Sequence, residues 1–375
     1  MKFKSTPQIL LPHVDFVARY AKPPFALAHI RVEDGKCTMR AMGPAVWVET
    51  SVDVFDAEDG ETLVNAAMLS SVLKTLVDNQ DITVSVKKRI TIAQGHQRRR
   101  TLQIASPDDF PSVPACGDNV VQLPIDFISS LDLVKFAVTT DANRPTLTGI
   151  CLDGRGVIAA ADGVRAAVWT VPELAGTAGA ILPISDVLQR AMSLADYKDE
   201  TFTLTLGGSW VQTTFGHVEV RMATIAGSYP DVVGIVSEPD KDAAMKVVVN
   251  RKDLRNIVGA ARIYTNSQMT KLHFECTDGV ISFSVESPDG TMKDEITCEG
   301  QGSWVVDLSP VLLDDALAAC PDDKLEMYVW APHKPILLVA AEGKWNMMQV
   351  PLMTTEDVDK YRQERADAGD NGDSW

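Results

Sequence analysis

Polar and apolar positions follow one pattern that occurs three times along the chain. In each occurrence a polar start precedes a short segment with apolar residues at helical spacing, then an acidic loop and a strand of alternating polarity. The three helical segments are Asn65–Leu76, Pro183–Leu194 and Asp307–Leu317. Their spacing of about 120 residues exceeds that of a solenoid repeat, which runs roughly 20–50 residues. The pattern therefore predicts three similar domains in tandem.

Tight turns between β-rich segments recur at matching positions. They fall at Asp34-Gly35, at Asp153–Gly156 and at Asp278-Gly279. Asp-Gly between such segments favours a β-hairpin, because glycine adopts positive φ without a Cβ clash. Each domain is therefore expected to be rich in antiparallel strands.

A second helix is predicted near the start of each domain. The segments Asp126–Phe136 and Asp253–Arg262 have apolar residues at helical spacing, and Ile9–Tyr20 is a weaker counterpart that Pro12 interrupts. The expected fold class is α+β, with three tandem copies of a β-rich, two-helix domain.

Domain boundaries are expected where the apolar periodicity stops. Pro114–Asp118 and Glu238–Ala243 have the composition of linkers. The predicted domains are residues 1–118, 119–243 and 244–353. Residues 354–375 are predicted to form an acidic, flexible tail, with a polar helix at Thr354–Arg365 and disorder at Ala366–Trp375.

Composition and charge narrow the class of protein. A hydrophobic content of 45% and a charged content of 23% are ordinary for a soluble globular protein. No apolar run approaches the roughly 20 residues that span a bilayer. Asp15, Pro7 and Pro12 argue against a signal peptide. The six cysteines include no Cys-x-x-Cys pair, a pattern that favours reduced thiols in a cytoplasm.

The net charge of −16 is spread unevenly. Residues 1–118 carry a net charge of 0, residues 119–245 carry −7, residues 246–353 carry −5 and residues 354–375 carry −4. A protein that binds nucleic acid by bulk charge would be basic. Any nucleic-acid role must therefore depend on a local basic surface.

No motif in the sequence positively supports catalysis, a metal site or a cofactor. His273 and Cys276 are three apart on a predicted strand, so their side chains should face opposite sides. Gly154–Ala159 matches a dinucleotide-binding pattern, but that motif must open a helix, and here it joins two predicted strands. Asp162-Gly-Val-Arg165 is best interpreted as a structural turn with an Asp–Arg contact. The chain is not expected to be an enzyme.

Several segments resemble the bacterial DNA polymerase III beta subunit, the sliding clamp or processivity factor. They are Asn143–Ile150, Ala159–Arg165, Ser228–Val232, Lys334–Leu338 and Met347–Leu352. They occur in the family's order and at family-like spacing. The resemblance covers about residues 1–353 and leaves the tail outside. A divergent or phage-encoded member would also fit these segments.

The resemblance implies a head-to-tail homodimer ring around duplex DNA, with helices lining the hole and sheets forming the rim. A closed ring holds DNA topologically, so weak contacts to phosphates without sequence specificity suffice. The candidate DNA-lining residues are Arg19, Lys22, Lys74, Lys135, Arg190 and Arg255.

The resemblance also places the dimer seam between the first domain of one protomer and the third domain of the other. The first domain has basic segments at Lys87–Arg89 and Arg98–Arg100, and the third has acidic residues between positions 286 and 295. Complementary charge at two edges favours head-to-tail docking. The candidate interface residues are Arg99, Arg100, Leu102, Ile263, Tyr264 and Glu295.

A hydrophobic cleft for partner peptides is the third implication. The family's partners are the polymerase III alpha subunit, the clamp loader and repair polymerases, which bind through short Gln/Leu/Phe motifs. The candidate cleft residues are Leu147, Ala161, Gly163, Val164, Arg165, Ala166, Pro230, Ile235, Met269, Pro310, Val350, Pro351 and Leu352. The family commonly has His, Leu and Tyr at positions 164, 166 and 310, and an arginine at position 234, so a less polar cleft is expected here.

Two functions other than the sliding clamp are alternatives. A dehydrogenase would use Gly154–Gly156 and requires a helix after that segment. A peptide-binding scaffold would keep the clamp fold without encircling DNA. The resemblance implies a cytoplasmic, nucleoid-associated protein without cofactors.

Overall fold

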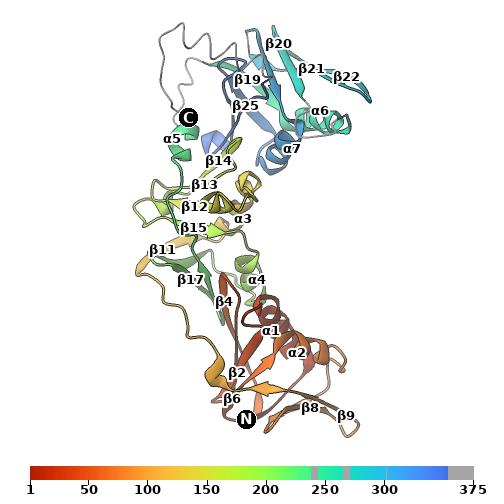
Figure 1. Ribbon diagram of the computed structural model, residues 1–375, viewed down its shortest axis with the longest axis vertical. Coiled ribbons are helices and arrows are strands. Elements are labelled where there is room, and N and C mark those ends of the chain that lie inside the picture. Colours follow the sequence, from red (N-terminus) through yellow and green to blue (C-terminus); the bar gives the residue numbers. More distant parts are fainter. Residues whose placement is uncertain (238–243, 265–270, 301, 354–375) are drawn as a thin grey trace. The chain divides into compact units, whose positions relative to one another are not determined.

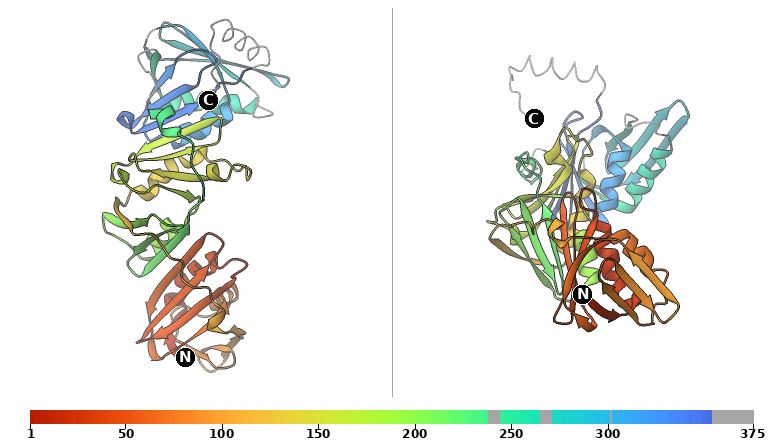
Figure 2. Two further views of the ribbon diagram at one scale, coloured as in Figure 1. Left: turned by 60° about the vertical axis from the view of Figure 1, so that its left-hand side comes forward. Right: turned by 60° about the horizontal axis from the view of Figure 1, so that its bottom comes forward.

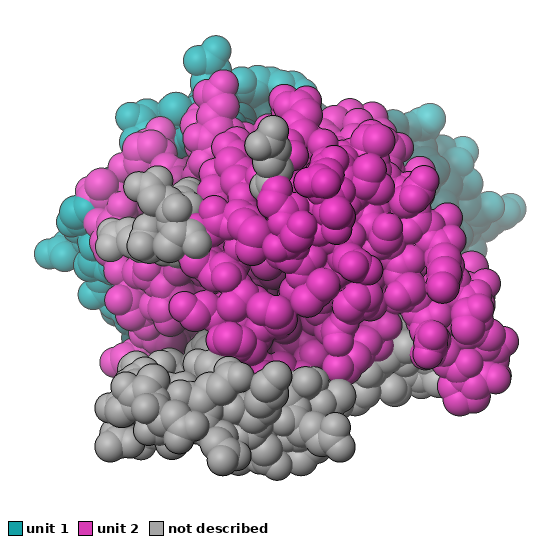
Figure 3. Space-filling model, turned by 90° about the horizontal axis from the view of Figure 1, so that it is seen from above, with its two compact units in different colours: residues 1–128, 176–226 teal, residues 129–175, 227–375 magenta. Residues whose placement is uncertain are grey.

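The computed structural model describes residues 1–237, 244–264, 271–300 and 302–353 (Figure 1). The predicted linker Glu238–Ala243, the predicted tail and the candidate cleft residue Met269 lie outside the described residues. The chain divides into two compact units, one of residues 1–128 and 176–226, the other of residues 129–175 and 227–375 (Figure 3). This division cuts through the middle segment predicted as residues 119–243, and the three-domain boundaries stay a prediction.

Unit 1 holds two antiparallel sheets (Figure 2). One has the strand order β5-β1-β7-β8-β9, and the other has the order β10-β6-β2-β3-β4-β18-β17-β16-β11. The strands of unit 1 are β1 (Lys2–Ser5), β2 (Leu27–Glu33), β3 (Lys36–Met42), β4 (Val46–Asp53), β5 (Phe55–Glu58), β6 (Gly60–Asn65), β7 (Ile82–Val86), β8 (Ile90–Gln94), β9 (Arg98–Leu102), β10 (Ile104–Ala105), β11 (Asn119–Pro124), β15 (Ala180–Pro183), β16 (Thr201–Leu206), β17 (Trp210–Phe215) and β18 (Val218–Ala223). Trp47 and Phe215 are among its largest fully buried side chains.

Unit 2 also contains two sheets. One includes the order β12-β13-β14-β27-β26-β25-β19-β23, and the other is β22-β21-β20-β24. The strands are β12 (Gly149–Asp153), β13 (Val157–Ala161), β14 (Arg165–Thr170), β19 (Met245–Asn250), β20 (Leu272–Thr277), β21 (Val280–Ser287), β22 (Gly290–Thr297), β23 (Glu299–Gly300), β24 (Trp304–Leu308), β25 (Lys324–Val329), β26 (Ile336–Ala340) and β27 (Trp345–Gln349). Together with the α-helices of the chain, these sheets confirm the predicted α+β class.

Several of the helices begin at capping residues. The α-helices are α1 (Pro7–Tyr20), α2 (Ala66–Leu73), α3 (Phe127–Ser130), α4 (Val187–Leu194), α5 (Val232–Ser237), α6 (Arg251–Ile263) and α7 (Pro310–Ala319). Asn65 accepts a hydrogen bond from the N–H of Met68 at 2.9 Å, and Asn250 accepts one from Lys252 at 2.9 Å. Such N-caps satisfy donors that the first helical turn leaves unpaired.

Pro12 does not interrupt the first helix, so that detail of the prediction was wrong. Helix α1 continues through Pro12, and its buried face includes Leu10, Val14 and Val17. An internal proline costs about 3 kcal/mol. Burying each of those apolar side chains contributes about 1.5–3 kcal/mol, which is enough to keep the helix intact.

The single helix predicted over Asp126–Phe136 is also wrong. This segment consists of the short α3 and two 3-10 turns, η2 (Leu131–Leu133) and η3 (Lys135–Ala137). The Trp345 Nε1–H donates to the Leu133 carbonyl at 2.9 Å, and Arg165 donates to the Phe136 carbonyl at 2.6 Å. Donors distant in sequence therefore bind carbonyl groups of the 3-10 turns that stand where a continuous helix was predicted.

The predicted hairpins are confirmed. Asp34 and Gly35 join β2 to β3 with φ values of 50° and 75°, and Asp278 and Gly279 join β20 to β21 with 50° and 85°. Positive φ at both central positions is the hairpin geometry that Asp-Gly favours. The turn after Asp153 joins β12 to β13. No helix follows it, so the dinucleotide-binding alternative is excluded.

A buried histidine, His13, is expected to make unit 1 sensitive to acid. His13 is 8% exposed, its Nδ1 lies 2.8 Å from Thr50 Oγ1, and its ring lies 5.3 Å from that of His217. Burial, with a contribution from His217, lowers the pKa of His13 to about 4. The folded state therefore binds a proton less readily than the unfolded state, and stability falls as pH drops from the unfolded value near 6.5.

We expect His13→Gln to remove this acid sensitivity. At about pH 4.5 the shift corresponds to a loss of about 2.5 kcal/mol relative to neutral pH. Urea unfolding at both pH values should show a smaller loss in His13→Gln than in the unchanged chain. His96→Gln, at an exposed position, serves as the control. An identical pH dependence in His13→Gln and the unchanged chain would contradict the assignment.

Candidate binding surfaces

One wall of the predicted cleft is a tight turn between β13 and β14 in unit 2. Asp162 Oδ1 accepts hydrogen bonds from the backbone N–H groups of Val164 and Arg165, both at 2.9 Å. Gly163 has a φ of 92°, which glycine adopts readily, and a Cβ there would collide with Arg144. The turn is thus fixed by local chemistry, and it leaves Val164 40% exposed.

Arg165 follows this turn and is 8% exposed. Its Nε donates to Asp162 Oδ2 at 3.0 Å. Its Nη1 donates to the Leu312 carbonyl at 2.8 Å and to Asp315 Oδ2 at 3.1 Å. Its Nη2 donates to the Phe136 carbonyl, and the guanidinium lies over the Phe136 ring. Arg165 therefore joins β14, η3 and α7 beneath the turn, and the predicted Asp–Arg contact is confirmed.

The segment after β27 runs beside this turn. The Val350 N–H donates to the Val164 carbonyl at 2.9 Å, and the Leu352 N–H donates to the Asp307 carbonyl at 2.8 Å. Pro351, which lies between them, is buried. Two candidate segments far apart in sequence, residues 163–166 and 350–352, are thereby brought together.

Helix α5 adds a further surface. Val232, Val233 and Val236 are buried in the cluster that also contains Leu147 and Ala161. The opposite side of the helix presents Ile235, which is 57% exposed.

Tyr229 is a residue that sequence reasoning missed. Its hydroxyl oxygen accepts a hydrogen bond from the Ala161 N–H at 2.9 Å, and burial raises the pKa of this hydroxyl. The segment Ser228-Tyr-Pro230 was recognised in the sequence as part of the resemblance, but nothing local pointed to Ala161, 68 residues away.

The described cleft candidates differ in accessibility. Leu147, Ala161, Arg165, Pro310 and Pro351 are buried; Ala166, Val350 and Leu352 are half-buried; Gly163, Val164, Pro230 and Ile235 are exposed. The exposed apolar side chains of Val164 and Ile235 are therefore the ones most available to a partner, whereas Arg165 is held inside the protein.

All six candidate DNA-lining cations are exposed, and five form ion pairs with other residues that the structure describes. In unit 1, Arg19 and Arg190 each lie 2.6 Å from Asp186, and Lys74 lies 3.0 Å from Asp15. They border a groove of about 730 Å³ beside α1, α2 and α4.

In unit 2, helices α6 and α7 lie side by side (Figure 1). Arg255 on α6 lies 3.2 Å from Asp314 on α7. Lys135 lies 2.5 Å from Asp132. For Lys22, the structure gives no ion pair with any residue that it describes.

Two edge strands carry the interface candidates. In unit 1, β9 is an edge strand of its sheet and has only β8 as a strand neighbour among the described residues. Arg99 and Arg100 are exposed on it, whereas Leu102 is 7% exposed.

In unit 2, β22 is likewise an edge strand and carries the exposed Glu295. At the end of α6, Ile263 is 80% exposed, the most of the large hydrophobic side chains that the structure describes as exposed. Tyr264 is half-buried. A Cβ at Gly290, the first residue of β22, would come within 3.3 Å of the Tyr264 ring.

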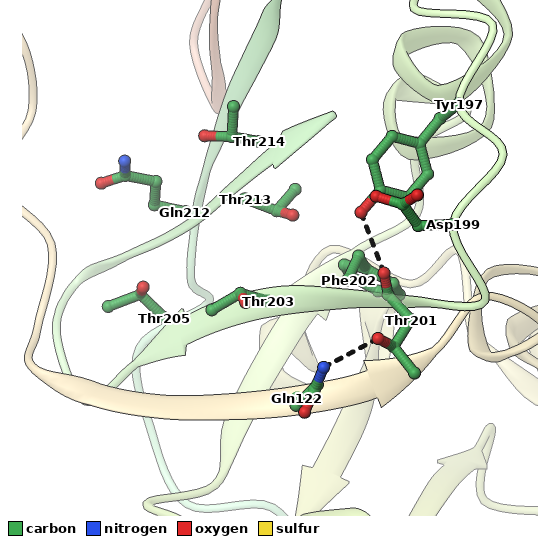
Figure 4. Close-up of a pocket in the computed structure, with 10 residues that line it drawn as sticks. All are labelled: Gln122, Tyr197, Asp199, Thr201, Phe202, Thr203, Thr205, Gln212, Thr213 and Thr214. Atoms are coloured by element: carbon green, nitrogen blue, oxygen red, sulfur yellow. Dashed lines mark hydrogen bonds between the residues drawn. The ribbon is translucent and has the colours of Figure 1, made fainter. Parts of the chain in front are cut away.

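A separate pocket of about 500 Å³ lies beside β11, β16 and β17 (Figure 4). The Tyr197 hydroxyl donates to the Thr201 carbonyl at 2.9 Å, and Gln122 donates to Thr201 Oγ1 at 2.8 Å. Asp199 is the only charged residue among those that line it. No predicted site residue lies in this pocket.

Several sequence expectations about chemistry can be compared with the structure. His273 is half-buried with its Nδ1 2.7 Å from Asp307 Oδ1, whereas Cys276 is buried on the other face of β20. All six cysteines are free thiols. Within the described part of the chain, no group of three or more potential metal ligands comes together. No described helix combines the length and apolar composition needed to cross a bilayer.

Comparison with known proteins relates this fold to one class. No protein-family model matches the chain. The chain is 24% identical over 303 residues to the beta sliding clamp of Staphylococcus aureus, a match that covers 75% of this chain and 79% of the relative. It is 22% identical over 295 residues to the beta sliding clamp of Staphylococcus epidermidis, covering 75% and 76%.

Solved structures match over more of the chain. The DNA polymerase III subunit beta from Pseudomonas aeruginosa has a TM-score of 0.84 at 20% identity and covers 94% of this chain and 100% of its own. The Caulobacter crescentus beta sliding clamp has a TM-score of 0.85 at 18% identity with the same coverage. The chain thus has the DNA clamp fold. Within that fold it resembles the bacterial DNA polymerase III beta subunit, the beta sliding clamp.

Proposed function

We propose that this chain is a DNA sliding clamp that works as a head-to-tail homodimer ring around duplex DNA. It is a binding protein and not an enzyme, and it tethers the replicative polymerase to its template. The observation that carries the proposal is the likeness to beta sliding clamps in sequence and in fold along most of the chain. A cytoplasmic, nucleoid-associated location follows from this role.

The two edge strands support ring closure. An edge strand presents unpaired backbone groups that can pair with a strand of another chain. In a head-to-tail dimer, β9 of each protomer would meet β22 of its partner. Arg99 and Arg100 on the first strand complement Glu295 on the second. Charge of opposite sign at the seam favours this pairing over the pairing of like edges.

The helices supply the surface for DNA. Arg19, Lys74 and Arg190 lie on or next to helices of unit 1, and Arg255 lies on α6 of unit 2. Exposed cations on the helices of each unit suit contacts to phosphates without base recognition. A ring with weak contacts can slide, since topology and not affinity keeps it on the DNA.

The surface around Val164, Ile235 and Leu352 is proposed to bind partner peptides. It combines exposed apolar side chains with a fixed turn, which suits an extended segment with apolar anchors. The proposed partners are the polymerase III alpha subunit, the clamp loader and repair polymerases with Gln/Leu/Phe motifs. With Val164 and Gly234 at positions where the family commonly has polar residues, apolar contacts should dominate.

Solution mass distinguishes the ring from a monomeric scaffold of the same fold. Sedimentation equilibrium should give a dimer of about twice the 40.8 kDa chain mass. A monomer at every accessible concentration would leave a clamp-fold peptide-binding scaffold as the better function.

We expect Ile235→Glu to weaken peptide binding by about 10-fold or more, because burial of a large apolar side chain contributes about 1.5–3 kcal/mol. Ile235 is exposed on α5, so the change should have little effect on folding. Titration of a fluorescent Gln-Leu-x-Leu-Phe peptide measures the effect. Val120→Glu, at a 65% exposed position in unit 1, is the matched control. Equal affinity for Ile235→Glu and the unchanged chain would place the peptide site elsewhere.

A further inference from the structure

Five of the six cations proposed to face DNA form ion pairs with carboxylates of this chain. Asp186 is the centre of one cluster in unit 1: its Oδ2 lies 2.6 Å from Arg19 and 2.6 Å from Arg190. Its Oδ1 accepts a hydrogen bond from the Tyr20 hydroxyl at 2.9 Å. One carboxylate thus neutralises part of the charge of two guanidinium groups and holds their positions.

This carboxylate stays ionised over the whole working range of pH. Burial acts to raise the pKa of Asp186, but hydrogen bonds from Arg190, Arg19 and Tyr20 outweigh burial and lower the pKa to about 2. Asp186 also stands at the N-cap position of α4 without capping it through its side chain. A carboxylate is favoured there by the helix dipole, and its oxygens remain available to the arginines.

A second carboxylate borders the same groove. Asp15 on α1 lies 3.0 Å from Lys74, and its Oδ1 accepts a hydrogen bond from the Ser70 hydroxyl at 2.5 Å. The ionised side chains that line this groove are therefore three cations and two carboxylates. The charge offered to a phosphate is about one third of what the cations alone would supply.

Unit 2 repeats the arrangement with different residues. Asp314 on α7 forms ion pairs with both Arg255 and Arg262 of α6. Its side chain is 15% exposed, whereas the two arginines are 45% and 44% exposed. Again one carboxylate holds two guanidinium groups that face solvent.

We propose that Asp186, Asp15 and Asp314 are counter-charge residues that set how weakly the helices hold DNA. This inference rests on the proposed clamp function and adds to it a determinant of sliding. A phosphate that approaches Arg19 or Arg190 must compete with Asp186, so its binding exchanges one anion for another. The net gain in the binding free energy of DNA is small, because the ion pair that is lost within the protein offsets the one that forms with the phosphate. The cations keep their positions while the duplex moves past them.

The proposal predicts a gain of binding when the carboxylate is removed. Asp186→Asn retains an oxygen that can accept from Tyr20 and frees two guanidinium groups for phosphates. Affinity for a short linear duplex should rise by about 5–10-fold at about 50 mM salt. The slope of log affinity against log salt should steepen by about 1 for each additional phosphate that the protein neutralises.

Asp56→Asn is the matched control. Asp56 on the edge strand β5 lies 2.6 Å from Lys4 on β1. The substitution therefore changes the net charge equally and also breaks an exposed ion pair. It should leave both affinity and salt slope within about twofold of the unchanged chain, because the groove gains no free cation. In a background of Arg19→Gln with Arg190→Gln, the gain from Asp186→Asn should disappear. Asp314→Asn tests the same idea independently in unit 2.

The outcomes distinguish a failure of the counter-charge role from a failure of the proposed clamp function. A rise in affinity with a steeper salt slope in Asp186→Asn or Asp314→Asn, but not in Asp56→Asn, supports the counter-charge role. If the unchanged dimer binds duplex and all three variants match it, the counter-charge role is overturned and the clamp function stands. If the unchanged chain shows neither dimerisation nor salt-dependent duplex binding, the clamp function is contradicted, and so is the counter-charge role that depends on it.

Discussion

Replacing Ile263 and Tyr264 together with glutamate is expected to convert the dimer into monomers. Ile263 is 80% exposed at the end of α6, and the Tyr264 ring packs beside Gly290 at the start of the edge strand β22. Apolar and aromatic side chains at the centre of an interface dominate its affinity, often by about 2 kcal/mol or more each. The double substitution should therefore raise the dimer dissociation constant by about a thousandfold, which corresponds to about 4 kcal/mol.

Sedimentation over a range of concentrations measures this constant. Val305→Glu is the control, since Val305 is 37% exposed on β24, the opposite edge strand of the same sheet. Circular dichroism of the double variant should match that of the unchanged chain, because neither Ile263 nor Tyr264 is buried in the protomer. A double variant that stays dimeric at the lowest measurable concentration would show that the seam lies elsewhere.

Arg165→Met is expected to destabilise unit 2 and to disrupt the peptide surface. The buried guanidinium donates to Asp162, to Asp315 and to the Leu312 and Phe136 carbonyls. Removing one partner from a buried charged network leaves the others unsatisfied and costs about 3–5 kcal/mol. The free energy of unfolding in urea should fall by about this amount, and peptide binding should weaken more than about tenfold as the turn beside Val164 loosens.

Arg155→Met is the control for Arg165→Met. Arg155 also pairs with two carboxylates, Asp153 and Asp231, but its side chain is 48% exposed. Exposed pairs of this kind contribute about 0–1 kcal/mol, so the control should lose little stability. Arg165→Lys should recover only part of the loss, because an ammonium cannot reproduce the planar fork of hydrogen bonds. Equal effects at Arg165 and Arg155 would contradict the organising role of Arg165.

Most of the successful fold predictions depended on interactions between residues that are close in sequence. Asn65 begins helix α2 because its side chain accepts a backbone hydrogen bond, and Asp34-Gly35 turns a hairpin because both residues take positive φ. Each of these outcomes depends on residues a few positions apart. The failed prediction at residues 126–136 involves distant partners instead: Trp345 and Arg165, from distant strands, donate to carbonyl groups of the 3-10 turns found there.

The candidate sites likewise combine features that the sequence predicted with contacts between distant residues that it did not. The resemblance selected Val164 and Ile235, which prove to be exposed apolar residues, but it also selected Arg165, which is committed to an internal network. The pairing of Arg190 with Asp186 follows the i,i+4 spacing on a helix and could have been predicted. The pairing of Arg19 with Asp186 joins positions 167 residues apart. No local pattern in the sequence contains that information.

The central claim is that the ring encircles DNA, and retention on circular DNA tests it most directly. Protein diluted to monomers and then reassembled in the presence of a nicked circular plasmid should trap DNA in a fraction of the rings. After gel filtration in about 1 M salt, where the Debye length is about 3 Å, contacts to phosphates are screened and only topological linkage remains. The account predicts that protein stays with the circle and is released when a restriction enzyme linearises the plasmid. Equal loss from circular and linear DNA would contradict it.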